Sequence, residues 1–314
     1  MAINTITLAT EMTGALDKAV VQKPVCGFFA DNALRAKFVG AATVTVPNME
    51  MSGLGDYDRD TGFVKGAVTI NRTSYTLNMD RGRSFQIDAQ DEDESGIPSL
   101  AGEVSGEFVR TKVCPEIDAY CLSKLGGYAA GLETPQTVAA NGALDESIYA
   151  MFLEAKQKVQ NAIGYDEELV WFVNSEVYHA IQTSPAISRM LDVTNFKKGD
   201  LNLQVKSIDG VPILPVPDSR MKTAFTFLDG TDHSGESGGA NETAGGFVPA
   251  ENASSIGFIL MPRRAASLVR KTEKVRIFEP SRNPEADAWK IDYRVYYDLL
   301  TRNSLLGGIY AYVY

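Results

Sequence analysis

A serine and a histidine, two residue types that catalyse hydrolysis in many enzymes, lie four residues apart in the sequence. Gly235, Ser237 and Gly239 match the G-x-S-x-G spacing, in which a nucleophilic serine occupies a tight turn between a strand and a helix. The segment around Ser237 is polar, with no apolar strand before it and no helical pattern after it, and His233 has no evident orienting partner. We interpret it as a flexible surface loop and keep a hydrolase acting through Ser237 as an alternative.

Asp56, Asp58 and Asp60 have the spacing of the first ligands of a calcium-binding loop. That loop also requires glycine at its sixth position and a bidentate glutamate at its twelfth, where this chain has Thr61 and Ala67. The sequence therefore favours a turn whose carboxylates meet basic side chains of a neighbouring molecule.

The remaining candidates have simpler structural explanations. His179 falls on a predicted helix, and Cys114 and Cys121 lie seven apart on one helix face without further metal ligands beside them. An acidic run at residues 91–94 precedes a predicted helix, where negative charge is favourable. The sequence predicts no catalytic site, no cofactor and no metal site.

Composition narrows the function further. The 314 residues include 30 Lys and Arg against 40 Asp and Glu, a net charge of −10, without the basic clusters that grip phosphates. No apolar run reaches the roughly 18 residues of a membrane helix, and Glu11 and Asp17 interrupt any signal peptide. With three cysteines and no CxxC pair, the chain is expected in a reducing cytoplasm, without direct nucleic-acid or membrane binding.

A long hairpin is predicted in the first third of the chain. Val44 and Val46 alternate with threonines, Val68 and Ile70 alternate again, and residues 52–66 between them are rich in glycine and aspartate. An isolated two-stranded hairpin is marginal in water, and its exposed edges invite pairing. We therefore expect the hairpin to rest on neighbouring copies of the chain.

A long amphipathic helix follows, with Leu100, Val104 and Phe108 recurring every four positions as its apolar core residues. Pro115 should kink or interrupt it. The predicted elements beyond are a helix at 145–163, a strand at 169–173, a helix starting at Asn174 or Ser175, strands around the turn Asp209–Gly210, a mobile loop at 229–255, and strands at 256–261, 276–278, 289–299 and 309–313. An amphipathic stretch is also predicted at 11–21.

Five stretches together resemble the major capsid proteins of tailed double-stranded DNA bacteriophages, the Hong Kong 97 fold family. They are GDYDRDTGF (55–63), DRGRSFQID (80–88), EFVRTKVCPEIDAY (107–120), RIFEP (276–280) and WKIDY (289–293). The resemblance implies an α+β fold divided into an N-terminal arm (1–37), an E-loop hairpin and its base (38–88), a peripheral-domain spine helix (89–131), an axial domain (132–262) and returning peripheral strands (263–314).

The resemblance also implies a function. Such chains self-assemble into hexamers and pentamers of an icosahedral shell, with a separate scaffold protein and a portal as expected partners, and they enclose DNA without reading its sequence. Encapsulin-like compartments, which share the fold and load protein cargo, remain an alternative. A different structural phage protein, such as a decoration or tube subunit, is another.

The charged residues flanking the predicted hairpin are the expected inter-subunit contacts: Asp56, Arg59, Asp60, Lys65, Arg81 and Arg83. Some relatives join a lysine to an asparagine covalently between subunits. Lys65 near the tip is the candidate lysine here, but no partner asparagine can be picked out, so we expect no cross-link.

Overall fold

A computed structural model describes residues 25, 27–30, 37–39, 43–91, 100–131, 137–139, 148–183, 192–198, 201–236 and 239–314. The predicted stretch at 11–21 and Ser237 lie outside these residues. The strands are β1 Lys37–Val39, β2 Thr43–Met51, β3 Val68–Thr76, β4 Met79–Asp88, β5 Thr137–Ala139, β6 Leu169–Asn174, β7 Asp192–Lys198, β8 Leu201–Ile208, β9 Val211–Val216, β10 Phe225–Leu228, β11 Gly246–Pro249, β12 Ile256–Pro262, β13 Ala266–Phe278, β14 Ala288–Thr301 and β15 Tyr310–Val313.

The helices are α1 Gly27–Ala30, α3 Leu100–Phe108, a π-helical turn Val109–Val113, α4 Cys114–Ala130, α5 Ile148–Ile163 and α6 Ser175–Thr183. Short 3-10 turns occupy Asp218–Arg220, Pro280–Arg282 and Asn303–Gly308. None of these described helices is long and apolar enough to cross a membrane.

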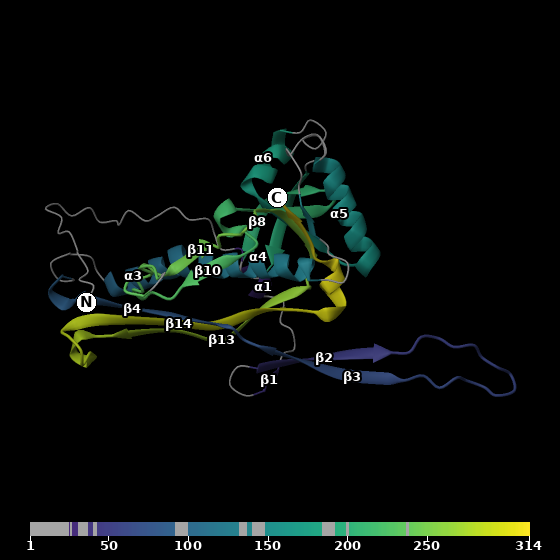
Figure 1. Cartoon of the computed structure of the whole chain (residues 1–314), viewed down its shortest axis with the longest axis horizontal. Helices are drawn as coiled ribbons and strands as arrows, with labels where there is room; N and C mark the ends of the chain where they lie inside the picture. Colours follow the sequence, from purple (N-terminus) through teal and green to yellow (C-terminus); the bar gives the residue numbers. More distant parts are fainter. Residues whose placement is uncertain are drawn as a thin grey trace.

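A long three-stranded sheet, in the order β13-β14-β4, lies along the side of the molecule opposite the seven-stranded sheet (Figure 1). We call it the base sheet. β14 lies in the centre and pairs antiparallel with both neighbours. From Ile291 to Tyr297 its residues alternate between buried and more exposed positions as the sequence pattern predicts, because one face of the sheet packs against helices. The prediction of a solvent-exposed face is wrong from Tyr297 to Thr301, where every residue is buried, Asp298 included.

The helices α3 and α4 run along this sheet as one long rod (Figure 1). The predicted interruption at Pro115 takes the form of the π-helical turn, which ends at Val113, two residues before the proline. The wider turn accommodates the proline ring, which would clash with a regular α-helical turn.

A mixed seven-stranded sheet, in the order β5-β15-β12-β6-β9-β8-β7, makes up the second part. All six residues of β6 are buried because both faces of this strand are covered. Val170 and Phe172 face the core beside α4, whereas Trp171 and Val173 face the core beneath α5 and α6. This double burial is why the strand reads as an uninterrupted apolar run.

Two connections of this sheet follow from short sequence motifs, a helix cap and a tight turn. Asn174 caps α6 by accepting a hydrogen bond from the backbone N–H of Val177 at 2.8 Å, as its position predicts. Asp209 and Gly210 both have positive φ (51° and 74°), the geometry of a tight two-residue turn between β8 and β9.

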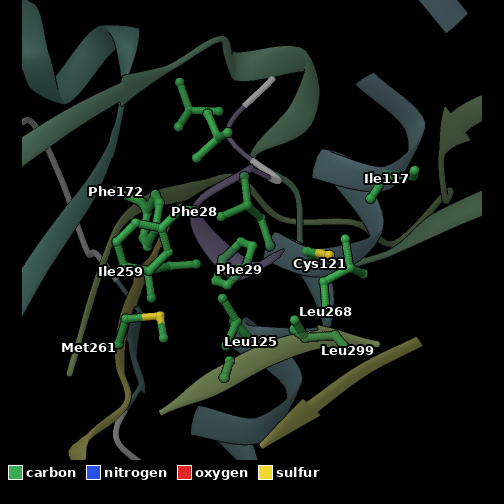
Figure 2. Close-up of a cluster of buried hydrophobic side chains, with 14 of the residues drawn as sticks. Phe28, Phe29, Ile117, Cys121, Leu125, Phe172, Ile259, Met261, Leu268 and Leu299 are labelled. Atoms are coloured by element: carbon green, nitrogen blue, oxygen red, sulfur yellow. The ribbon is translucent and has the colours of Figure 1, made fainter. Parts of the chain in front are cut away.

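The main core lies where α4, the seven-stranded sheet and the β13–β14 ribbon meet. Figure 2 shows Phe28 and Phe29 of α1 inserted between Phe172 on one side and Leu125 on the other. The rings of Phe28 and Phe29 pack edge to face at 5.3 Å, and Phe29 stacks on Phe172 at 5.7 Å. Helix α1 is therefore an integral part of the core.

A buried ion pair crosses the same core. Arg220 donates from Nη1 to Asp118 Oδ2 at 2.9 Å, and the backbone N–H of Val25 donates to the same oxygen at 2.9 Å. The two side chains are only 5% and 0% exposed. The contact ties α4 to the turn Asp218–Arg220 and to the residues that lead into α1.

The prediction of a mobile loop over 229–255 is wrong for Gly246–Pro249, which forms β11 and pairs antiparallel with β10. Phe225 and Phe247 pack edge to face at 5.3 Å across this pair. The glycine-rich composition hides β11, because only Phe247 and Val248 of its four residues are large and apolar, and they stand among turn residues that suggest a loop.

Candidate assembly interface

The predicted hairpin is present and projects beyond the rest of the molecule (Figure 1). β2 and β3 pair antiparallel over nine residues, from Thr43 opposite Thr76 to Met51 opposite Val68. Ser52 and Ala67 close the ladder with a backbone hydrogen bond of 3.0 Å. Residues 52–67 beyond it form the tip.

Among the described residues, the contacts between the hairpin and the body lie at the base of the hairpin. Val44 is buried against Leu77 and Leu300. The hydroxyl of Tyr75 donates to Asn303 Oδ1 at 2.9 Å, and that of Tyr296 donates to the carbonyl of Leu77 at 3.0 Å. The buried positions of β2 and β3 lie at this end, and exposure rises toward the tip.

The distal half of the hairpin exposes an apolar surface, which we call the apolar tip. It consists of large apolar side chains within residues 52–67 and on the adjoining ends of β2 and β3. Leu54 and Phe63 are 107% and 87% exposed. The ring of Phe63 meets that of Tyr57 at 4.8 Å, a contact within the tip itself. The full set of exposed large apolar side chains here is Met49, Met51, Leu54, Tyr57, Phe63, Val64, Val68 and Ile70. Such a contiguous exposed set is typical of a surface that binds another molecule.

Four of the residues predicted to contact neighbouring subunits lie in this tip: Asp56, Arg59, Asp60 and Lys65. All four side chains are exposed, and within the described residues none forms an ion pair. Asp58, which lies between them in the sequence, folds the turn: its Oδ1 accepts from the backbone N–H groups of Asp60 and Thr61 at 2.6 and 3.2 Å.

These backbone hydrogen bonds lower the pKa of Asp58 below its usual value. The carboxylate thus stabilises a tight turn, bridged from Asp58 to Gly62, that presents the four charged side chains. Gly62 has a φ of +82°, a left-handed conformation that glycine adopts readily.

The other two predicted contact residues, Arg81 and Arg83, lie on β4 and have partners within the chain. Arg81 forms a two-pronged ion pair with Glu116 of α4, with its shorter bond at 2.8 Å, and also donates to the carbonyl of Gly246 at 3.2 Å. Arg83 donates to the carbonyl of Thr243 at 2.8 Å. Their role toward a neighbouring subunit stays a prediction.

Comparisons with known proteins give one consistent result. No family model matches the chain, and no curated protein matches it in sequence. Solved structures do match. The mature capsid of bacteriophage PhiM1 has a TM-score of 0.59 with 14% identity, covering 97% of this chain and 91% of that one. The capsid of cyanophage P-SCSP1u has a TM-score of 0.58 with 11% identity, covering 98% and 92%.

A third structure, the capsid of a native GTA particle, has a TM-score of 0.53 with 14% identity and covers 98% of this chain and 95% of that one. The chain has the fold of phage capsid proteins. The match extends over almost the whole length on both sides, so the capsid fold includes the projecting hairpin, the long helix and both sheets. The α+β class and the Hong Kong 97-type architecture expected from the sequence are confirmed.

The long helix of the capsid fold bears the predicted spine residues. Val104 packs partly buried against a small cluster around Ile87, Ala101 and Ile291. Phe108 stands edge to face with Phe85 at 4.9 Å and with Tyr293 at 5.7 Å. Leu100 begins α3, but its side chain lies outside the described residues.

The residues considered for chemistry fall elsewhere in the capsid fold. His179 is exposed on α6, and Cys121 is buried in the main core, where loss of solvation raises the pKa of its thiol well above the usual value. A thiol held neutral in this way is a poor nucleophile. The expectation that His233 lacks an orienting partner is wrong, since its Nε2 lies 2.8 Å from Asp229 Oδ2.

The apolar tip is the feature that sequence reasoning missed. Met49, Met51, Val68 and Ile70 were recognisable as one face of a hairpin, but alternation alone indicates a buried face without showing which molecule buries it. The signal that could have revealed it is Leu54, Phe63 and Val64, three large apolar residues within a segment otherwise typical of turns.

Proposed function

We propose that this protein is the shell subunit of a tailed-phage capsid, an icosahedral container for packaged DNA assembled from hexamers and pentamers of the chain. Its location is then the virion, after assembly in the host cytoplasm with a separate scaffold protein and a portal. The fold supports the proposal, as does the net charge of −10, which suits a wall that encloses DNA without gripping it.

The single observation that carries the proposal is the projecting hairpin with its apolar tip. Residues such as Leu54 and Phe63 are as exposed as those of an extended chain, and a soluble protein gains nothing by holding them so unless another molecule covers them. In a closed shell, every hairpin has a neighbouring subunit that can cover these side chains. The domain boundaries drawn above (1–37, 38–88, 89–131, 132–262 and 263–314) belong to this proposal.

The proposal assigns no enzymatic role. The serine of the G-x-S-x-G match lies outside the described residues, and His233 is held by Asp229 and by Thr231 Oγ1, 2.8 and 2.7 Å from its Nε2. The comparisons give phage and GTA capsids, and no observation favours an encapsulin-like compartment or a hydrolase.

Electron microscopy of the purified protein in negative stain, expressed with and without its scaffold, tests the proposal directly. Closed polyhedral shells or capsomer rings are the expected result. A monomer or dimer under both conditions, at concentrations where related subunits assemble, would contradict it. Denaturing gels of the same shells test the expectation that Lys65 forms no covalent cross-link, since cross-linked subunits would give a ladder of masses.

Reversing one charge at the tip should weaken assembly without unfolding the subunit. Arg59 is exposed on the turn built by Asp58, so Arg59→Glu removes no contact within the described chain but places a repulsive charge at the expected contact. We expect a lower shell yield with unchanged circular dichroism. Arg59→Lys, which keeps the charge, is the matched control and should assemble nearly normally. A normal shell yield from Arg59→Glu would show that Arg59 does not contribute to the interface.

A further inference from the structure

The loop that joins β10 to β11 brings one imidazole and two carboxylates to one point. The ligand atoms of Asp229, His233 and Glu242 all lie within 4.8 Å of one another. Asp229 and His233 are four residues apart near the start of the loop, whereas Glu242 lies nine residues further on, so its approach to the other two depends on how the loop folds. His233 is half-buried, and Glu242 is also partly covered.

Each of the three side chains is held by a second contact. The backbone N–H and Oγ1 of Thr231 donate to Asp229 Oδ1 at 2.8 and 2.7 Å, which leaves Oδ2 facing His233 Nε2. Thr231 Oγ1 also lies 2.7 Å from Nε2. Glu242 Oε2 accepts from the backbone N–H of Asp229 at 3.0 Å.

The other ring nitrogen of His233 has a carboxylate beside it as well. Its Nδ1 lies 3.4 Å from Oε1 of Glu236, a residue outside the three-ligand group. Histidines that bind metals commonly have such an outer carboxylate on the second nitrogen, where it fixes the orientation of the ring and raises its basicity. This contact is what separates the cluster from an ordinary patch of surface acids.

We propose that Asp229, His233 and Glu242 bind a divalent transition-metal ion of the zinc type, with water completing its coordination. One imidazole nitrogen with two carboxylate oxygens is a ligand set suited to such an ion, whereas magnesium and calcium favour oxygen ligands alone. A ring nitrogen binds a metal only when it carries no hydrogen, so metal binding at Nε2 replaces its contact with Asp229 Oδ2. The three carboxylates around the histidine, with Glu236 included, supply the negative charge.

The loop is built tightly enough to hold such a site. A side chain at Gly239 would collide with the carbonyl of His233, since a Cβ there would lie 1.9 Å from that oxygen. The backbone N–H of His233 donates to the carbonyl of Ala240 at 3.0 Å, and Asp232 is bridged to Asn241. The backbone that carries the ligands is therefore fixed on both sides of His233.

Metal binding would act on the contact between this loop and the base sheet. The carbonyls of Thr243 and Gly246 accept hydrogen bonds from Arg83 and Arg81 of β4. An ion that joins Asp229 to Glu242 closes the loop on which these carbonyls lie. We therefore expect metal to protect residues 229–236 and 239–246 from hydrogen exchange. This inference does not depend on the proposed shell function.

Titration calorimetry of the full chain with Zn²⁺, in a buffer that does not bind metals, tests the site. The expected result is one saturable equivalent, with little heat from Mg²⁺ or Ca²⁺. His233→Ala should weaken binding by at least about tenfold, and Glu236→Gln should weaken it within the roughly 10–100-fold range of outer-sphere carboxylates. Circular dichroism should show that both variants stay folded.

The chain provides its own matched control, because it has two histidines. His179→Ala removes the exposed imidazole of α6 and should leave Zn²⁺ binding unchanged. Co²⁺ added to the wild type should give a spectrum without a thiolate charge-transfer band, which excludes the cysteines as ligands. Absence of saturable Zn²⁺ binding, a thiolate band, or equal loss from His179→Ala and His233→Ala would overturn the proposal.

Discussion

Replacing Asp118 with asparagine should cost the subunit about 3–5 kcal/mol of its free energy of unfolding, because the change leaves Arg220 buried without a counter-charge. The asparagine keeps the shape of the side chain, so no cavity contributes. The lost carboxylate is fully buried and accepts from both Arg220 and the backbone N–H of Val25. Urea denaturation of unassembled subunits measures the difference.

The control lies on the same long helix. Glu107 pairs with Arg110 three residues later, and the two side chains are 30% and 37% exposed. Glu107→Gln should therefore cost no more than about 1 kcal/mol, the usual limit for exposed pairs. Replacing both members of the buried pair, as Asp118→Leu with Arg220→Met, should recover part of the loss. If Asp118→Asn and Glu107→Gln lower the free energy of unfolding equally, the buried ion pair contributes little to stability.

Replacing Leu54 and Phe63 together with serine should prevent shell formation while leaving the subunit folded. Burying each side chain contributes roughly 1.5–3 kcal/mol, so each hairpin loses about 3–6 kcal/mol of association free energy. At about 1.4 kcal/mol for each tenfold change, the association constant of a single contact falls at least 100-fold. Sedimentation velocity across a concentration series measures the loss of assembled species.

The stability of the isolated double variant should change by no more than about 0.5 kcal/mol, because both side chains are exposed in the single chain. Leu54→Met with Phe63→Leu keeps the tip apolar and is the matched control, which should still assemble. If the serine variant forms shells at the wild-type concentration, the apolar tip does not contribute to the interface.

Elements with a strong local signal were predictable from the sequence. The long helix, the buried strand β6 and the cap at Asn174 follow from apolar periodicity and capping chemistry, and the structure confirms them. The hairpin was predictable as well, because β2 and β3 are adjacent in the chain and separated by turn residues. Each of these signals arises within a short window of residues.

Features that depend on distant partners were not predictable. β13 runs from Ala266 to Phe278, but only 276–278 was expected, because most positions after Val269 are exposed and give no alternating pattern. The placement of Arg81 and Arg83 against the β10–β11 loop depends on contacts across about 160 residues of sequence. The convergence of Asp229, His233 and Glu242 likewise follows from the folded loop, which reads in sequence as a polar linker.

The order of the strands also constrains when the molecule can fold during synthesis. β14 supplies the central strand of the base sheet and pairs with β4, more than 200 residues earlier, while β15 lies inside the seven-stranded sheet between β5 and β12. The base sheet can be completed only once β14 has been translated, and the seven-stranded sheet only once β15 has been translated. A nascent chain therefore exposes its apolar hairpin before the sheets that carry it are complete, and the translation of β14 and β15 determines when the chain can finish folding and, under the proposed function, join a shell.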